Sequence, residues 1–124
     1  MNPWTKIREL MDAVPEEKRR LVAYDAWSAR YGCGCFFGTL YPNTPRRPGR
    51  DTRMNYIGLA YDDEYVYGGD ASLRFHEWMA EVGLTREDVH ALQQKNDEYP
   101  GYSTEERWFV MYEYVARRER EFTA

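Results

Sequence analysis

The chain has 124 residues and a net charge of -4, and its composition is 43% hydrophobic and 16% aromatic. A chain of this length can bury one hydrophobic core, and its content of large apolar side chains excludes an intrinsically disordered protein. No segment approaches the roughly 18 apolar residues of a membrane span, and the N-terminus lacks the apolar run of a signal peptide. We therefore expect a single cytoplasmic domain over residues 1–124.

The charges are distributed unevenly along the chain. Residues 1–60 carry ten Lys/Arg and six Asp/Glu, whereas residues 61–98 carry three and ten. No tract is long enough to form a disordered charged tail, so these charges are expected on a folded surface. The acidic surface is predicted to come from the middle of the chain.

Two helices are predicted before the cysteines. Apolar residues recur at helical spacing from Trp4 to Val14, which predicts a helix over residues 5–13. Pro15 ends this helix and also suits the first position of a second one, because its fixed φ is already helical. Gly32 is expected to end the second helix.

Both cysteines lie in a glycine-rich stretch between Tyr31 and Tyr41. The mixture of Gly, Cys and Phe over Cys33–Leu40 predicts a tight, buried connection or a short helix packed against the second helix. Cys33 and Cys35 are poorly placed for a disulfide with each other. A thiol in apolar surroundings ionises reluctantly, so both are expected to be reduced and mainly structural.

The sequence Cys35-Phe36-Phe37-Gly38-Thr39-Leu40, followed by Asn96-Asp97 and a last helix, resembles small uncharacterised proteins of bacteria and their phages. Their pattern is a Cys-x-x-Gly-x-Leu element and a later Asn-Asp pair. This chain departs from it by placing Phe36 and Thr39 where alanine is common. The resemblance implies a phage or prophage setting and carries no chemistry with it.

Residues 42–53 contain three prolines and four arginines, which predicts an exposed basic loop. The loop is either a solvated connection or a phosphate-contacting segment that uses Arg46, Arg47 and Arg50. The next segment, near residues 54–67, is rich in aromatic and branched residues around an acidic centre. It predicts a small β-hairpin, with a helix as the alternative.

Two helices are predicted in the acidic part of the chain. Apolar residues from Phe75 to Val82 are spaced for one buried face, and Gly83 can end their helix. Thr85 and Asp88 have the spacing of a capping box, which predicts a helix over residues 86–96.

A last helix is predicted to end near Arg120. Ser103 and Glu106 form a second capping-box pattern, and Trp108 begins an apolar stripe on the following residues. The predicted fold class is therefore α+β and α-rich, with about five helices and one small β-hairpin in a single compact domain.

A catalytic role for the cysteines is the alternative interpretation. Cys33 or Cys35 could act as a nucleophile with His76 or His90 as base, but no family signature surrounds the cysteines. The spacing of these four side chains matches no usual zinc site, and the glycine-rich stretch lacks the Lys-Ser/Thr of a phosphate loop. We predict no catalytic residue, no metal site and no cofactor.

Binding is the leading function class. The predicted contacts interleave carboxylates with aromatic rings: Asp62, Asp63, Glu64, Asp70, Tyr61, Tyr65 and Tyr67. The expected partner is a host protein with a basic surface, without direct contact to nucleic acid or membrane. We predict a small acidic phage-type protein that blocks a nucleic-acid-handling host protein, such as a CRISPR inhibitor. The alternatives are a small cysteine-dependent enzyme and an accessory protein with neither role.

Overall fold

The computed structural model describes residues 2–19, 22, 27–28, 35–44, 53–98 and 101–123. These residues form seven helices and two strands of two residues each. In chain order the elements are α1 (Pro3–Asp12), α2 (Glu16–Arg19), β1 (Trp27–Ser28), α3 (Phe36–Leu40), β2 (Arg53–Met54), α4 (Tyr56–Tyr61), α5 (Asp70–Val82), α6 (Arg86–Asn96) and α7 (Thr104–Thr123).

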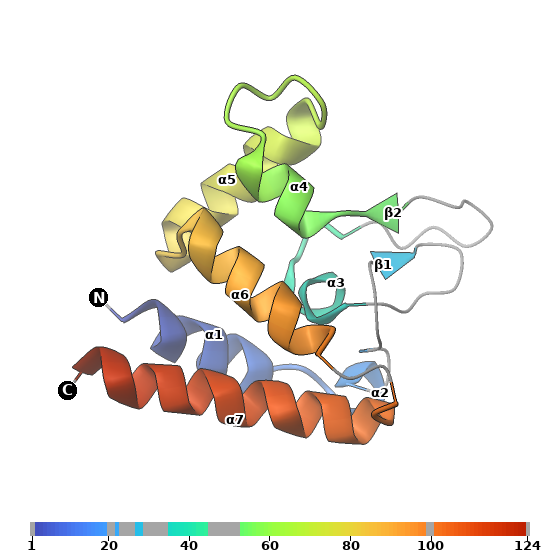
Figure 1. Cartoon of the computed structure of the whole chain (residues 1–124), viewed down its shortest axis with the longest axis vertical. Helices are drawn as coiled ribbons and strands as arrows, with labels where there is room; N and C mark the ends of the chain where they lie inside the picture. Colours follow the sequence, from blue (N-terminus) through green and yellow to red (C-terminus); the bar gives the residue numbers. More distant parts are fainter. Residues whose placement is uncertain are drawn as a thin grey trace.

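The first and last helices lie side by side and run in opposite directions (Figure 1). The side-chain amide of Asn2 donates to the carbonyl oxygen of Glu119 at 3.0 Å, and the hydroxyl of Tyr112 donates to Asp12 at 2.8 Å. These bonds attach both ends of α1 to α7. Helix α6 lies between this pair and α4, which packs on α5 as well (Figure 1).

The predicted β-hairpin near residues 54–67 is wrong, and with it the α+β class. Residues 56–61 form helix α4, and the chain then turns through a loop into α5. Strand β2 pairs antiparallel with β1, in the register Trp27 to Met54, rather than with a later strand. Apart from that two-residue pairing, the regular structure of the described residues is helical.

Helix α4 forms because its local pattern is helical. The side chain of Asn55 accepts a hydrogen bond from the amide of Gly58 at 3.0 Å and so caps the first turn. Tyr56, Leu59 and Ala60 are buried and have the i, i+3, i+4 spacing of one helix face. Aromatic and branched residues had suggested strands, but the capping residue and this spacing favour the helix that was the alternative prediction.

Among the remaining helices, α5, α6 and α7 begin or end where the sequence predicted. Helix α6 has the predicted bounds, and Thr85 and Asp88 form the predicted capping box. Gly83 ends α5 with φ at 92°, which favours glycine. At the start of α7, Ser103 and Glu106 exchange side-chain and backbone hydrogen bonds of 3.1 Å, as the second capping box requires. The predicted continuation of the second helix to Gly32 is wrong where the chain is described, because α2 ends at Arg19 and Trp27–Ser28 form strand β1. Apart from Val22, the other residues of that continuation lie outside the described residues.

The centre of the core is a cluster of aromatic rings. The ring of Phe37 lies 5.6 Å from Tyr56, 6.0 Å from Phe75 and 6.3 Å from Trp78. Tyr41 stands edge-on to Phe75 at 5.1 Å. Aromatic pairs at these distances, most of them edge-to-face, add to the energy gained by burying their area. Helices α3, α4 and α5 are therefore held together by rings from different parts of the chain.

The two motifs of the family resemblance meet in this core. The backbone amide of Phe36, in the first turn of α3, donates to the side-chain oxygen of Asn96 at 3.0 Å. Asn96 is fully buried, and the guanidinium of buried Arg107 donates to its carbonyl oxygen. Helix α3 is thus the short buried helix that was one of the two predicted forms. It packs on α6, and its rings contact those of α4, α5 and α7.

Candidate functional site

The loop between α4 and α5, residues 62–69, projects at the top of the molecule (Figure 1). We call residues 61–73 the α4–α5 surface, because the end of α4 and the first turn of α5 continue the loop. Six of the seven predicted contact residues lie exposed on it. The seventh, Asp62, has a different position.

Asp62 is 7% exposed and turns its carboxylate inward, where it organises the loop. One carboxylate oxygen accepts hydrogen bonds from the hydroxyl of Ser72 at 2.6 Å and the amide of Gly68 at 2.8 Å. The other accepts from the amide of Val66 at 3.0 Å. Asp62 therefore fixes the loop from within and does not offer its carboxylate to a partner.

These hydrogen bonds stabilise the charged form of the carboxylate. The hydroxyl of Ser72 has the largest effect, followed by the amide of Gly68, and together they hold the pKa of Asp62 below its ordinary value. Gly68 is needed for this close approach, since a Cβ placed there would lie 2.0 Å from the hydroxyl oxygen of Ser72. The loop is therefore held in one conformation by hydrogen bonds to the charged carboxylate of Asp62.

Tyr65 occupies the left-handed region of the backbone, with φ at 56°. This conformation is uncommon for a bulky residue and persists only where the surrounding structure enforces it. The amide of Tyr65 donates to the carbonyl oxygen of Asp62 at 3.2 Å, and its ring stands edge-on to His76 at 5.4 Å. His76 is fixed in turn by a 2.9 Å hydrogen bond between its ring and the carbonyl oxygen of Leu59.

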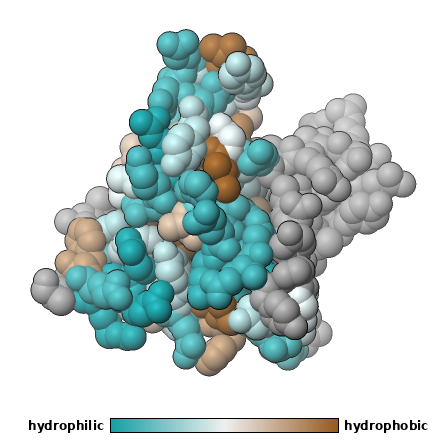
Figure 2. Space-filling model, in the orientation of Figure 1, coloured by the Kyte–Doolittle hydropathy of each residue, from teal (hydrophilic) through white to brown (hydrophobic). Residues whose placement is uncertain are grey.

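The loop presents apolar side chains to solvent. Tyr67 is 95% exposed and Val66 is 66% exposed, and Tyr61, Tyr65 and Leu73 are exposed near them. In Figure 2 the top of the molecule, where this loop lies, carries hydrophobic surface beside hydrophilic surface. A hollow of about 440 Å³, lined by Tyr67, Leu59 and Ser72 among others, adjoins the loop.

Carboxylates surround these apolar side chains. Asp63, Glu64 and Asp70 are exposed. Asp63 forms an ion pair with Arg86, whose guanidinium also lies over the ring of Tyr61 at 5.3 Å. Among the described residues, Glu64 and Asp70 have no ion-pair partner within 4 Å, so these two carboxylates retain most of their field at the surface.

The sequence identified most of this surface but missed Val66 and Leu73, and it gave no sign that His76, just beyond the surface, contacts Tyr65. Val66 lies between Tyr65 and Tyr67, two predicted contacts, so its place in the sequence could have identified it as a third. Leu73 and His76 belong to α5, and no local pattern separates them from ordinary helix residues. They belong to the site because the loop folds back onto the first two turns of α5.

The other predicted sites are partly outside the described residues. Cys33 and the arginines of the basic loop, Arg46, Arg47 and Arg50, lie there. Cys35 is fully buried at the N-cap of α3. The rings of His76 and His90 contact Tyr65 and Tyr61, and neither histidine is hydrogen-bonded to Cys35.

The described part of the chain contains no group of three or more His, Cys, Asp or Glu side chains that could hold a metal ion. None of its helices is long and apolar enough to cross a membrane. Comparison with protein-family models, with curated proteins and with solved structures finds no match to this chain. The function therefore has to be argued from the α4–α5 surface itself.

Proposed function

We propose that this protein acts by binding a partner protein with a basic surface through the α4–α5 surface. The partner is a host protein that handles nucleic acid, and binding blocks it. The contacts are the carboxylates of Asp63, Glu64 and Asp70 and the rings of Tyr61, Tyr65 and Tyr67, with Val66 added from the structure. In a phage or prophage setting this is an anti-defence role, of which CRISPR inhibition is one form.

The observation that carries the proposal is the locked loop with exposed apolar side chains. Three consecutive residues, Tyr65, Val66 and Tyr67, are held in solvent by a buried carboxylate, and one of them has an unfavourable backbone conformation. A loop selected for stability alone would bury these side chains or replace them with polar ones. Fixing them in place lowers the entropy lost on binding, which favours a role as anchors at an interface.

The charge of the surface favours a basic partner. Glu64 and Asp70 flank the exposed tyrosines, and the segment from residue 61 to residue 98 carries ten acidic and three basic residues. Such a surface speeds association with a basic partner, and the effect weakens as salt shortens the Debye length to about 8 Å at physiological ionic strength. The exposed rings then supply contact area that salt does not screen.

Blocking follows from competition for one surface. Proteins that bind nucleic acid neutralise phosphates with Lys and Arg, so their binding sites are basic and solvent-accessible. An acidic surface with protruding aromatic side chains can occupy such a site, with carboxylates meeting the cations that would contact phosphate. Binding of this protein and of nucleic acid would then be mutually exclusive.

A photo-reactive amino acid at position 67 identifies the partner directly. We expect it to crosslink one host protein, and we expect the same probe at exposed Glu9 on α1 to crosslink none. The purified partner is then titrated with the wild-type protein and with Glu64→Lys/Asp70→Lys. The matched control is Glu9→Lys/Glu17→Lys, which makes the same change of net charge at two exposed positions far along the chain.

We expect the loop double variant to bind at least about tenfold more weakly, with a smaller dependence on salt, and the control to bind as the wild type does. An oligonucleotide ligand of the partner should displace the wild-type protein. Equal affinities of the two double variants, or binding that an oligonucleotide leaves unchanged, would refute the proposal.

A further inference from the structure

Helix α7 has a second face that no described element covers. Its inner face buries Trp108, Met111 and Val115 against α1 and the core. Its outer face carries Phe109, which is 60% exposed, together with exposed Glu113 and Arg117. This face therefore combines an exposed aromatic ring with charges of both signs.

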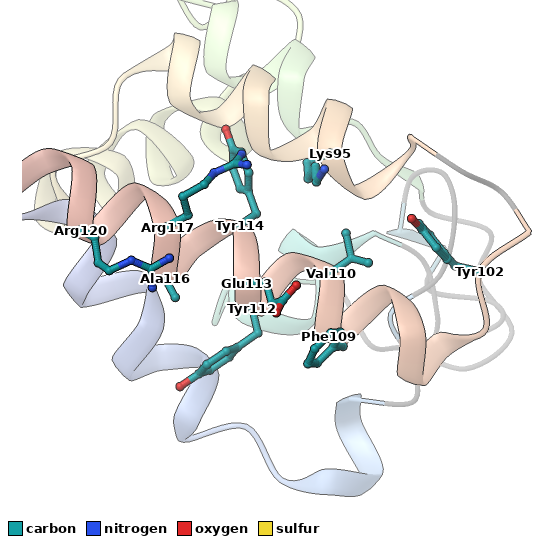
Figure 3. A pocket seen from close by; sticks show the side chains of 10 residues that line it. All are labelled: Lys95, Tyr102, Phe109, Val110, Tyr112, Glu113, Tyr114, Ala116, Arg117 and Arg120. Atoms are coloured by element: carbon teal, nitrogen blue, oxygen red, sulfur yellow. The ribbon is translucent and has the colours of Figure 1, made fainter.

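A hollow of about 580 Å³ runs along this outer face (Figure 3). Figure 3 shows Tyr114, Arg117 and Lys95 gathered between α7 and α6, whereas Phe109 and Tyr112 turn the other way. Phe109 also borders a second hollow, of about 330 Å³, beside Asp12 and Trp108. Its ring therefore forms a ridge between two depressions, which is a shape that can interlock with a copy of itself.

The charges on the outer face have a fixed order along the helix. Glu113 comes first, and Arg117 and Arg120 follow one and two turns later. Glu113 and Arg117 have the spacing of a helical ion pair. Arg117 instead lies over the ring of Tyr114 at 5.4 Å and within 3.8 Å of Glu121. Within the described part of the chain, Glu113 has no ion-pair partner inside 4 Å.

We propose that this face binds a second copy of the chain, with the two α7 helices antiparallel about a twofold axis level with Val115. In this arrangement Glu113 of each copy lies opposite Arg117 of the other, because the two residues are equally far from the axis. The same symmetry brings Phe109 level with Glu121 of the second copy and next to Arg120, at the basic end of the larger hollow. An aromatic ring and a guanidinium attract each other in such a position.

The mixed charge favours a second copy over other occupants. A uniformly acidic partner would be repelled by Glu113, and a uniformly basic one by Arg117 and Arg120. A second antiparallel α7 reverses the order of the charges, so that Glu113 meets Arg117 twice across one twofold axis. The α4–α5 surface lies on other elements, so this inference does not depend on the proposed function.

Reciprocal charge exchange tests the arrangement. Glu113→Arg places two arginines opposite each other across the axis, and Arg117→Glu places two glutamates there. We expect each variant alone to self-associate at least about tenfold more weakly than the wild type in sedimentation experiments. An equimolar mixture of the two variants should recover dimers, because every opposed pair then has opposite charges.

Controls separate this result from a folding defect. Both substituted side chains are exposed, so circular dichroism of each variant should match the wild type. Phe109→Ser should also weaken self-association, whereas Tyr67→Ala on the α4–α5 surface should leave it unchanged. A wild-type chain that stays monomeric at all concentrations, or a mixture that fails to recover dimers, would overturn the proposal.

Discussion

The aromatic cluster of the core and the tyrosines of the α4–α5 loop are made of the same residue types in opposite surroundings. In the core, Phe37, Tyr56 and Phe75 fix one another through ring contacts of 5.3 to 6.0 Å. In the loop, Tyr65 and Tyr67 are exposed, and the backbone is fixed by the carboxylate of Asp62.

The difference shows two ways of ordering an aromatic side chain. Burial orders the rings of the core and supplies most of the folding energy at the same time. The loop is ordered by polar bonds to one side chain, which leaves its apolar area unused in the free protein. That unused area is available to a partner, which is why we assign the binding function to the loop.

The largest expected effect comes from breaking the core cluster. Phe37→Ala removes a fully buried ring that contacts four others, and we expect it to lower the free energy of unfolding by about 3–5 kcal/mol. Urea denaturation followed by circular dichroism measures the loss. If Phe37→Ala lowered the free energy of unfolding no more than truncation of an exposed loop tyrosine does, the contrast between the core cluster and the loop would be contradicted.

A smaller effect is expected from breaking the buried hydrogen bond between Asn96 and the backbone amide of Phe36. Asn96→Ala leaves the buried amide of Phe36 without its acceptor, which should cost about 1–3 kcal/mol of unfolding free energy. Gln94→Ala is the matched control, since Gln94 is exposed on the same helix two residues earlier. Equal stabilities of the two variants in the same denaturation experiment would show that the bond contributes nothing.

Acid should weaken the loop through Asp62. Its pKa is lower in the folded protein than in the unfolded chain, so its contribution is fully present above the unfolded value of about 3.9. The contribution is lost as the pH falls through the folded pKa. We expect Asp62→Asn to be less stable than the wild type at neutral pH, and the gap between their thermal midpoints to close on acidification.

The comparison with Asp62→Asn is necessary because other carboxylates also titrate. The pKa values of Glu106 and Glu119 are lowered as well, by hydrogen bonds to Ser103 and Arg8 respectively. Both groups are present in the wild type and in the variant, so they cancel in the difference. A gap between the midpoints that stays constant with pH would show that Asp62 is not the titrating anchor.

The smallest effect on folding is expected at the tip of the loop. Tyr67 is 95% exposed, so Tyr67→Ala should change the free energy of unfolding by no more than about 0.5 kcal/mol. The same variant should bind the partner more weakly, because truncating an anchoring ring removes contact area. A clear loss of stability would mean that the ring supports the loop, and the contrast with the core would fail.

Much of the helical structure could be predicted because the signals that begin and end helices are local. The capping boxes at Thr85 and Ser103 and the glycine stop at Gly83 act within about one helical turn, so their residues can be read directly from the sequence. The prediction for the short segment 54–67 was wrong, because a few aromatic and branched residues are compatible with a strand and with a buried helix.

The candidate site was predictable in composition but not in orientation. The interleaved acids and tyrosines of residues 61–70 are visible in the sequence, and most of them are exposed. Asp62 and Asp63 are adjacent and chemically identical, yet one carboxylate is buried and the other is exposed. The choice depends on Ser72, ten residues later, whose hydroxyl meets Asp62 only after the loop has folded back onto α5.

The sequence by itself determined four of the helices, the capping boxes of α6 and α7, the glycine that ends α5 and the acidic, tyrosine-rich character of one segment, because these depend on residues within a few positions of one another. Only the tertiary structure decided that α3 is held by Asn96, 60 residues away. It also decided which carboxylate turns inward. Such choices are made by contacts between distant parts of the chain, which local pattern does not encode.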